Sequence, residues 1–188
     1  GFMVNNARGD KTPYFMTANH CGISESRAAS LVVYWNYQRS QCRGGDDASL
    51  DNFQTGATWL ASSTKSDFTL VKLNESPKKE WNVKYAGWDR SGRNAVTAIA
   101  IHHPNTDEKS ISFEYDGTKR TSYLRNVVIS DGSHVMVEDW DVGTTEPGSS
   151  GSPLFDENHR IIGQLQGGYA SFRSQTADWF GCFSTSWG

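Results

Sequence analysis

Short runs in which apolar and polar residues alternate recur along most of the chain, with Gly, Pro, Asn and Asp between them. Because successive side chains of a strand point to opposite faces, each such run predicts a strand with one buried face. The runs lie at 14–18, 30–37, 66–73, 95–102, 110–115, 134–138, 160–165 and 180–187, and residues 1–6 also have the character of a strand interior.

The spacing of these runs predicts the fold class. The sequence has no internal repeat and no long stripe of helical period. Many short strands separated by turns are typical of all-β proteins built as sandwiches or barrels of antiparallel strands. The polar segment 74–80 falls near the middle of the chain. The pattern therefore predicts two β-halves, residues 1–80 and 81–188, joined at this segment.

Composition narrows the kind of partner. Of the 188 residues, 18 are basic and 21 acidic, so the net charge is −3 and there is no general positive field for a nucleic acid. No apolar run reaches the length of a membrane span. The chain contains 9 Phe, 7 Trp and 7 Tyr, residues that bury large areas and favour strands. We expect a folded β protein whose partners are neither nucleic acids nor membranes.

The cysteines are Cys21, Cys42 and Cys182. None belongs to a CxxC pair or stands near a second histidine at zinc-ligand spacing, so the sequence predicts no metal site. An odd number of cysteines leaves three possibilities. One cysteine has a disulfide partner outside this chain, or one thiol is free, or all three are unpaired and buried in a reducing compartment.

The stretch TEPGSSGSPLF, residues 145–155, combines two signals. Gly148 to Ser152 has the composition of a flexible linker. Yet it is short, lies between Pro147 and Pro153, and runs directly into an apolar pair. A flexible linker does not need flanking prolines and apolar residues, so the stretch predicts a turn that holds one serine hydroxyl in place. A flexible linker is the alternative.

A serine becomes a nucleophile when a base takes its proton, and a carboxylate orients that base. His20 follows the predicted strand 14–18 and precedes a cysteine. Asp67 lies at the start of the predicted strand 66–73. A carboxylate at the end of a strand can be partly buried and still contact an imidazole. The order His20, Asp67, Ser150 is that of the chymotrypsin arrangement.

Longer motifs resemble a known family. TANHCG, SDFTLVKL and EPGSSGSPLF resemble the histidine, aspartate and serine motifs of trypsin-like serine peptidases. Within that clan the chain is more closely similar to bacterial lysyl endopeptidases, through VVYWNYQ, AGWDR, AIAIHHPN, TEPGSSGSP and TSW. The likeness covers nearly the whole chain. It implies that a strand before GFMVNN and further sequence after TSW are absent here, so that the domain is truncated at both ends.

The resemblance implies a fold of two antiparallel β-barrels of the chymotrypsin type, with the active site between them. Residues 1–80 would form the first barrel, incomplete at its N-terminus, and carry His20 and Asp67. Residues 81–188 would form the second barrel and carry Ser150 and the specificity pocket.

The resemblance also implies roles. Ser150 attacks the scissile carbonyl, His20 accepts its proton, and Asp67 orients His20. The backbone N–H groups of Gly148 and Ser150 form the oxyanion hole. Asp178, matched by its offset from TSW, receives the basic side chain of the substrate. A surface acid in a turn is the alternative interpretation of Asp178.

Two features leave the choice between lysine and arginine open. Some relatives carry a histidine where this chain has Gln166. The family also has an aromatic residue near the active site, for which Tyr123, Trp140 and Tyr169 are the candidates here.

Other notable residues receive no catalytic role. Cys21 and Cys42 match family cysteines whose disulfide partners lie upstream of residue 1, whereas Cys182 has no recognised counterpart. His102 and His103 are adjacent, so they point to opposite faces of a strand and are interpreted as structural.

These inferences predict a secreted serine endopeptidase that cleaves after lysine through an acyl-enzyme. We expect a monomer that acts on protein or peptide substrates without cofactor or metal. Two alternatives stay open. One is a trypsin-like peptidase with Arg/Lys or other specificity, and the other is a non-catalytic, β-rich secreted binding module.

Overall fold

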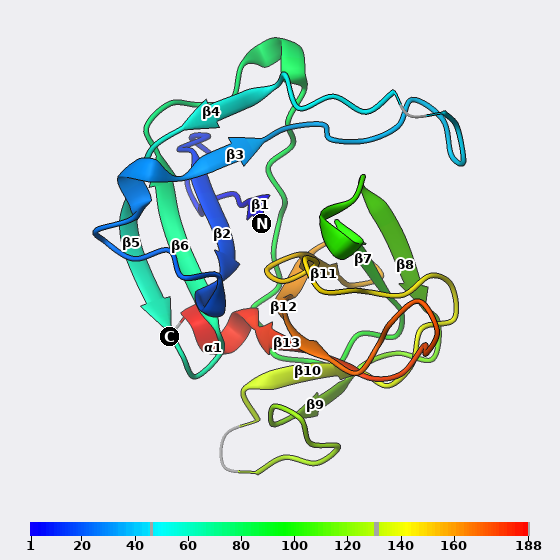
Figure 1. Cartoon of the computed structure of the whole chain (residues 1–188). Helices are drawn as coiled ribbons and strands as arrows, with labels where there is room; N and C mark the ends of the chain where they lie inside the picture. Colours follow the sequence, from blue (N-terminus) through cyan, green and yellow to red (C-terminus); the bar gives the residue numbers. More distant parts are fainter. Residues whose placement is uncertain (46, 130–131, 188) are drawn as a thin grey trace.

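The computed structural model describes residues 1–45, 47–129 and 132–187. Within these residues, strands form most of the regular secondary structure. A four-stranded antiparallel sheet has the order β1-β2-β6-β5 (Figure 1). Its strands are β1 (Phe2–Met3), β2 (Tyr14–Ala18), β5 (Ala57–Ser63) and β6 (Phe68–Leu73). A separate two-stranded sheet pairs β3 (Val32–Tyr34) with β4 (Phe53–Thr55).

The second large sheet has seven strands in the order β8-β7-β11-β12-β13-β10-β9, all paired antiparallel. They are β7 (Ala98–His102), β8 (Ser110–Glu114), β9 (Lys119–Thr121), β10 (His134–Val137), β11 (Pro153–Phe155), β12 (Ile161–Gly168) and β13 (Asp178–Cys182). The predicted all-β fold class with two antiparallel units is confirmed.

Helical segments are short. They are η1 (Asn19–Cys21), η2 (Ala28–Ser30), η3 (Lys79–Trp81), η4 (Pro104–Thr106) and α1 (Phe183–Trp187). None of the helices in the described part of the chain has the length and apolar character that a membrane span requires.

Most predicted strands are present. The runs at 14–18, 66–73, 95–102, 110–115, 134–138 and 160–165 correspond to β2, β6, β7, β8, β10 and β12, and the opening residues form β1. The predicted strand 30–37 is real only over the three residues of β3.

The predicted strand 180–187 is wrong after Cys182, where α1 begins. In a helix, Phe183 and Trp187 stand on one face. Both rings pack against Trp88, with ring centroids 5.7 and 4.4 Å away. In a strand these two side chains would be roughly 13 Å apart. The helix is therefore the conformation that brings both rings onto Trp88.

The alternation pattern also misses β5, because Thr58-Trp-Leu-Ala61 does not alternate. The register of β5 against β6 shifts between Trp59 and Ala61, and Leu60 lies at this irregularity with 40% of its surface exposed. The side chains of β5 still alternate between exposed and less exposed positions along the whole strand. The sequence hides this alternation because Leu60, an apolar residue, stands at an exposed position.

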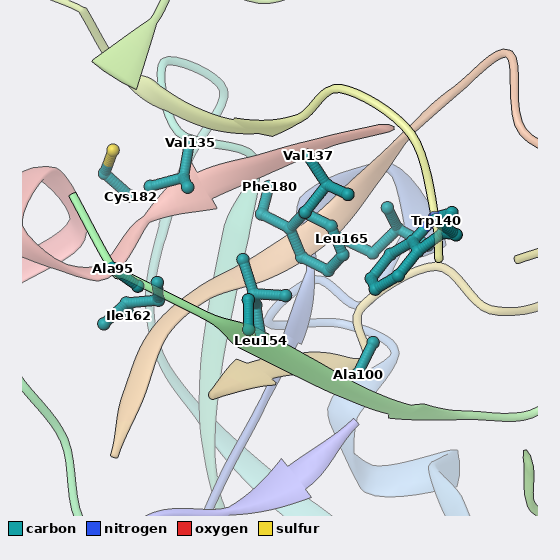
Figure 2. Packing of buried hydrophobic residues seen from close by; sticks show 11 residues of the cluster. Ala95, Ala100, Val135, Val137, Trp140, Leu154, Ile162, Leu165, Phe180 and Cys182 are labelled. Atoms are coloured by element: carbon teal, nitrogen blue, oxygen red, sulfur yellow. The ribbon is translucent and has the colours of Figure 1, made fainter. Parts of the chain in front are cut away.

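A cluster of buried apolar side chains lies within the seven-stranded sheet (Figure 2). It consists of Ala95, Ala98, Ala100, Val135, Val137, Trp140, Leu154, Ile162, Leu165, Phe180 and Cys182. Leu154 of β11 and Phe180 of β13 have no exposed surface. Full burial of a large apolar side chain is worth about 1.5–3 kcal/mol, so this cluster stabilises the strands around β12.

Two further clusters organise the rest of the interior. One lies around the four-stranded sheet and includes Phe15, Val71 and Trp81. The other combines residues from or next to the two large sheets and from α1 near the C-terminus, namely Phe2, Val4, Met16, Phe68, Ile161 and Phe183. This third cluster joins the two large sheets.

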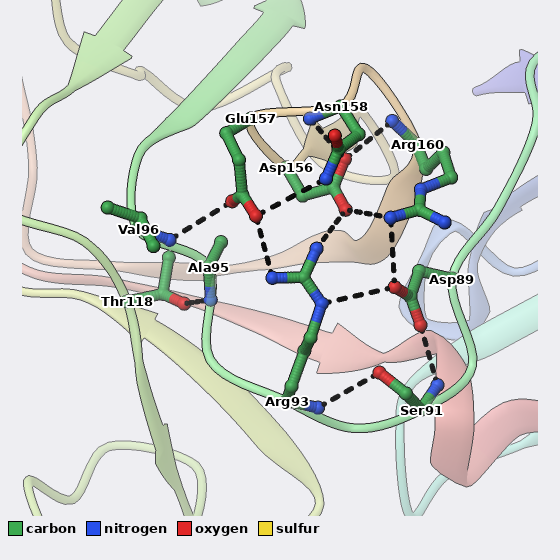
Figure 3. Close-up of polar contacts among 10 residues, drawn as sticks. All are labelled: Asp89, Ser91, Arg93, Ala95, Val96, Thr118, Asp156, Glu157, Asn158 and Arg160. Atoms are coloured by element: carbon green, nitrogen blue, oxygen red, sulfur yellow. Dashed lines mark hydrogen bonds and ion pairs between the residues drawn. The ribbon is translucent and has the colours of Figure 1, made fainter.

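A polar network holds the connection between the sheets against the β11–β12 turn (Figure 3). Arg93 contacts the carboxylates of Asp89, Asp156 and Glu157 at 3.3, 2.8 and 2.6 Å. The Asp156 side chain has no exposed surface, and its Oδ1 also accepts the Arg160 N–H at 2.8 Å. A buried carboxylate needs such donors, because burying an unpaired charge is costly.

Replacing Arg93 by methionine is expected to lower the free energy of unfolding by about 1–3 kcal/mol, because buried Asp156 loses the nearer of its two guanidinium partners and keeps only Arg160 at 3.5 Å. Arg8→Met is the matched control. Arg8 pairs with Asp10 at 3.5 Å, but its side chain is 79% exposed, and exposed pairs contribute about 0–1 kcal/mol. Urea denaturation measures both variants. Equal losses would contradict this account of the network.

Candidate active site

His20 lies in the short turn η1, directly after β2. The turn ends at Gly22, whose φ of 77° is a left-handed conformation that glycine adopts at little cost. The Asn19 N–H donates to the carbonyl of Asp67 at 2.8 Å. This backbone bond fixes the end of β2 beside the start of β6, so that His20 and Asp67 are neighbours.

The carboxylate of Asp67 holds His20 by two hydrogen bonds, one to its backbone and one to its imidazole. Its Oδ1 accepts the backbone N–H of His20 at 2.9 Å, and its Oδ2 lies 2.7 Å from His20 Nδ1. Because an ionised carboxylate only accepts, Nδ1 carries the proton, and in the neutral imidazole Nε2 is then the acceptor. Asp67 is 3% exposed and has a φ of 52°, uncommon for a residue other than glycine. It thus stands at a bend immediately before β6.

Ser150 reaches the imidazole from the loop that precedes β11. Its Oγ lies 2.7 Å from His20 Nε2. With Nε2 as the acceptor, the hydroxyl donates. The structure therefore brings together the three residues that the sequence predicted, hydrogen-bonded in the order Asp67, His20, Ser150.

Two glycines allow this loop to approach the rest of the protein. Gly148 and Gly151 have φ angles of 97° and 76°. A Cβ on Gly151 would lie 2.2 Å from Thr17 Oγ1 and 2.7 Å from the Ala18 nitrogen. A Cβ on Gly148 would lie 2.7 Å from the Thr106 nitrogen. The segment is a tightly packed turn, and its interpretation as a flexible linker is wrong.

Backbone N–H groups in this turn are of two kinds. Those of Ser149 and Gly151 donate to backbone carbonyls at 3.0 and 2.8 Å. Those of Gly148 and Ser150 donate to no protein acceptor among residues 1–45, 47–129 and 132–187. The two N–H groups expected to form an oxyanion hole are thus the ones available to a ligand oxygen.

Asp178 is buried at the start of β13, opposite Gly168 of β12, with 1% of its surface exposed. Its interpretation as a surface acid is wrong. Its Oδ2 accepts hydrogen bonds from Trp140 Nε1 at 2.8 Å and from Thr145 Oγ1 at 2.6 Å. Burial raises the pKa of this carboxyl, and these hydrogen bonds oppose the rise. Glycine is required at 168, where a Cβ would lie 2.5 Å from Asp178 Oδ1.

Tyr123 lies near both buried carboxylates. Burial raises the pKa of its hydroxyl, and the negative charges of Asp67 and Asp178 add to the rise. Its ring centroid is 5.2 Å from that of His134, and His134 Nε2 lies 2.6 Å from Gln166 Oε1. An imidazole therefore stands beside Gln166. No local pattern marks His134, because it and Gln166 are 32 positions apart.

The other two aromatic candidates have different surroundings. Trp140 contacts Asp178 directly. Tyr169 packs edge-on against Trp179, with ring centroids 5.6 Å apart.

Sequence reasoning assigned no role to Thr145, although it opens the TEPGSSGSP motif and its hydroxyl donates to Asp178.

The cysteines lie outside this constellation of side chains. Cys21 and Cys42 are exposed, and neither forms a disulfide within the described part of the chain. The expectation of partners upstream of residue 1 stays a prediction. Cys182 is buried in the core of the seven-stranded sheet. Among the described residues, no three His, Cys, Asp or Glu side chains are grouped in a way that could hold a metal ion.

Gly151→Ala is expected to destabilise the protein by about 1–3 kcal/mol, because the added methyl group would overlap the backbone of β2. Gly9→Ala is the control, since Gly9 also has a positive φ, 63°, but a Cβ there would meet nothing within 4 Å. Thermal unfolding of the two variants checks the prediction. Equal melting temperatures would show that the close approach at Gly151 is not a constraint.

Known proteins resemble this chain in sequence. Residues 1–181 match the family described as lysyl endopeptidase, C-terminal domain. Lysyl endopeptidase from Pseudomonas aeruginosa is 32% identical over 198 aligned residues, which cover 98% of this chain and 40% of that protein. The chain thus spans less than half the length of this relative.

Solved protease structures share the fold. The HtrA-type protease AlgW with a decapeptide has a TM-score of 0.61 at 18% identity, covering 98% of this chain and 48% of that one. A Glu endopeptidase in complex with MPD has a TM-score of 0.53 at 17% identity, covering 92% and 77%. At these identities the likeness concerns the fold alone. Sequence and fold agree, and the chain belongs to the lysyl endopeptidase C-terminal domain family, with the trypsin-like all-β fold.

Proposed function

We propose that this chain is the catalytic unit of a serine endopeptidase that cleaves peptide bonds on the carboxyl side of lysine. One observation carries the proposal. The imidazole of His20 has Asp67 Oδ2 at 2.7 Å on one nitrogen and Ser150 Oγ at 2.7 Å on the other. A hydroxyl within reach of a base that a third group orients is the arrangement that activates a serine.

The chemistry follows from that geometry. Ser150 Oγ attacks the scissile carbonyl carbon while His20 Nε2 takes its proton. The imidazolium then donates this proton to the leaving amine as the C–N bond breaks, which leaves an acyl-enzyme. A water molecule attacks the acyl-enzyme with His20 again as the base, and the acid product and Ser150 are released. Asp67 stays ionised throughout and stabilises the imidazolium.

The N–H groups of Gly148 and Ser150 are proposed to stabilise the oxyanion of each tetrahedral intermediate. Both lie in the same tight turn as the nucleophile, and neither has a protein acceptor among the described residues. Donors that are already in place when charge develops lower the barrier. The loss of one such donor in comparable enzymes costs about 3–4 kcal/mol.

Asp178 is proposed to receive the basic side chain of the substrate. Its hydrogen-bond partners Trp140 and Thr145 are neutral, so the buried negative charge attracts a cation. A neutral side chain would leave the carboxylate unpaired and should be rejected roughly a hundredfold or more. The name of the Pseudomonas relative favours lysine. Arginine is the alternative specificity.

We also propose a division of the chain near residue 80, a secreted location and a monomeric state. The strands of the four-stranded sheet all lie before residue 74, and those of the seven-stranded sheet all lie after residue 97. Exposed Cys21 and Cys42 are suited to disulfides with segments outside this chain.

Matched peptide anilides with Lys, Arg or Leu before the scissile bond test the function. Hydrolysis of the Lys anilide is expected to exceed that of the Leu anilide roughly a hundredfold in kcat/KM. Ser150→Ala should lower the rate by about 10⁴-fold or more, because no other hydroxyl can replace the nucleophile. Equal rates for Lys and Arg would discard lysine specificity. Failure of the folded protein to cleave any anilide or to react with an organophosphonate would favour the binding module.

The buried carboxyl of Asp178 predicts a pH dependence of KM. A cationic side chain binds the ionised form, and burial raises the pKa from the ordinary 3.8. As the pH falls through this raised pKa, Asp178 takes a proton and the attraction is lost, so KM for the Lys anilide should rise. Asp178→Asn should give a high KM that does not change over the same pH range. If KM for the Lys anilide did not change as the pH falls in the unmodified protein, Asp178 would not be the group that binds the cationic side chain.

A further inference from the structure

His102 is a buried imidazole beside the loop that carries Ser150. It ends β7 and is 1% exposed. Its Nδ1 lies 2.9 Å from Ser149 Oγ, and its Nε2 lies 2.9 Å from Ser112 Oγ. Both serines are also 1% exposed. The three side chains therefore satisfy one another in a place that water does not reach.

The surroundings fix the direction of each hydrogen bond. Ser112 Oγ donates its one proton to the Thr144 carbonyl at 3.2 Å, so it accepts from His102 Nε2. Burial lowers the pKa of His102 to about 4, so the ring is neutral near pH 7 and Nδ1 is an acceptor. Ser149 Oγ therefore donates to Nδ1, and it accepts the Glu146 N–H at 3.4 Å.

These hydrogen bonds anchor both ends of the loop 144–149. The Thr144 carbonyl is held by Ser112 of β8, and the Ser149 hydroxyl is held by the imidazole at the end of β7. Between them, the Pro147 carbonyl accepts the Asn105 N–H at 2.7 Å. The loop is thus fixed to one edge of the seven-stranded sheet immediately before Ser150.

We propose that His102 is a positioning residue, which acts through Ser149 to hold the backbone N–H groups of Gly148 and Ser150 in the orientation that an oxyanion requires. The inference rests on the proposed peptidase function. Ser149 stands between the two donors, so a rotation of its backbone would turn both of them. Gly148 gives the loop conformational freedom, and a hydrogen bond to a buried side chain removes it.

A double-mutant cycle tests the proposal. His102→Phe and Ser149→Ala are each expected to lower kcat on the Lys anilide by about 10- to 100-fold with little change in KM, because the transition state needs the oriented donors more than the bound substrate does. The double variant should be no slower than the slower single variant, since both changes break the same contact. A double loss equal to the product of the single losses would overturn the proposal.

Ser152→Ala is the matched control. It also deletes a buried serine hydroxyl two residues from the nucleophile, and that Oγ has no hydrogen-bond partner among the described residues. Its kcat should stay within about twofold of the unmodified value. Ser149→Ala removes a single oxygen atom, so it keeps the test decisive if His102→Phe does not fold.

Amide hydrogen exchange separates this inference from the proposed function. In Ser149→Ala, exchange in the peptide 144–152 should be at least about tenfold faster, while exchange in β12 should stay the same. Unchanged exchange in 144–152 would overturn the positioning role. Faster exchange in Ser149→Ala, together with no hydrolysis by the unmodified protein, would keep His102 as the anchor of the loop and refute the peptidase activity.

Discussion

Gly151 lies against Thr17 and Ala18, and this contact sets the distance between the loop of one sheet and the strand end of the other. Ser150 precedes Gly151 in the chain, and His20 follows Ala18 by two residues. A side chain at 151 would therefore push Ser150 Oγ away from His20 Nε2. The 2.7 Å separation of Ser150 Oγ and His20 Nε2 depends on a missing Cβ as much as on the two polar groups.

Two buried aspartates in this region have opposite surroundings. Asp67 accepts from the backbone and the ring of His20, a group that can become a cation. Asp178 accepts from a tryptophan and a threonine, which stay neutral. The first carboxylate therefore has a partner within the protein that can share its charge. The second has only neutral donors on its Oδ2, an arrangement that suits a carboxylate that binds a cationic ligand.

A loop that contains glycine loses much conformational freedom when it is ordered. Here the loss is offset by hydrogen bonds to side chains on the strands behind the loop. Thr145 reaches Asp178, and Ser149 reaches His102. Each of these bonds joins groups that are nearly or wholly buried, where an unsatisfied partner would cost about 1–3 kcal/mol. The same contacts that make the turn rigid also link the loop that carries Ser150 to the buried Asp178.

Alternating apolar residues identified β2, β6, β7, β8, β10 and β12, because a period of two is a local property of the chain. The motifs around His20, Asp67 and Ser150 were recognisable for the same reason, since each combines a polar residue with the small or apolar residues that shape its own turn or strand. What local sequence could not supply were the irregular register of β5 at Leu60 and the helix at 183–187, which packs on Trp88. Nor could it pair Ser149 with His102 or Thr145 with Asp178, 47 and 33 positions apart. Such contacts arise only when the strands of the sheet align, because no local pattern records which distant side chain will face a given hydroxyl.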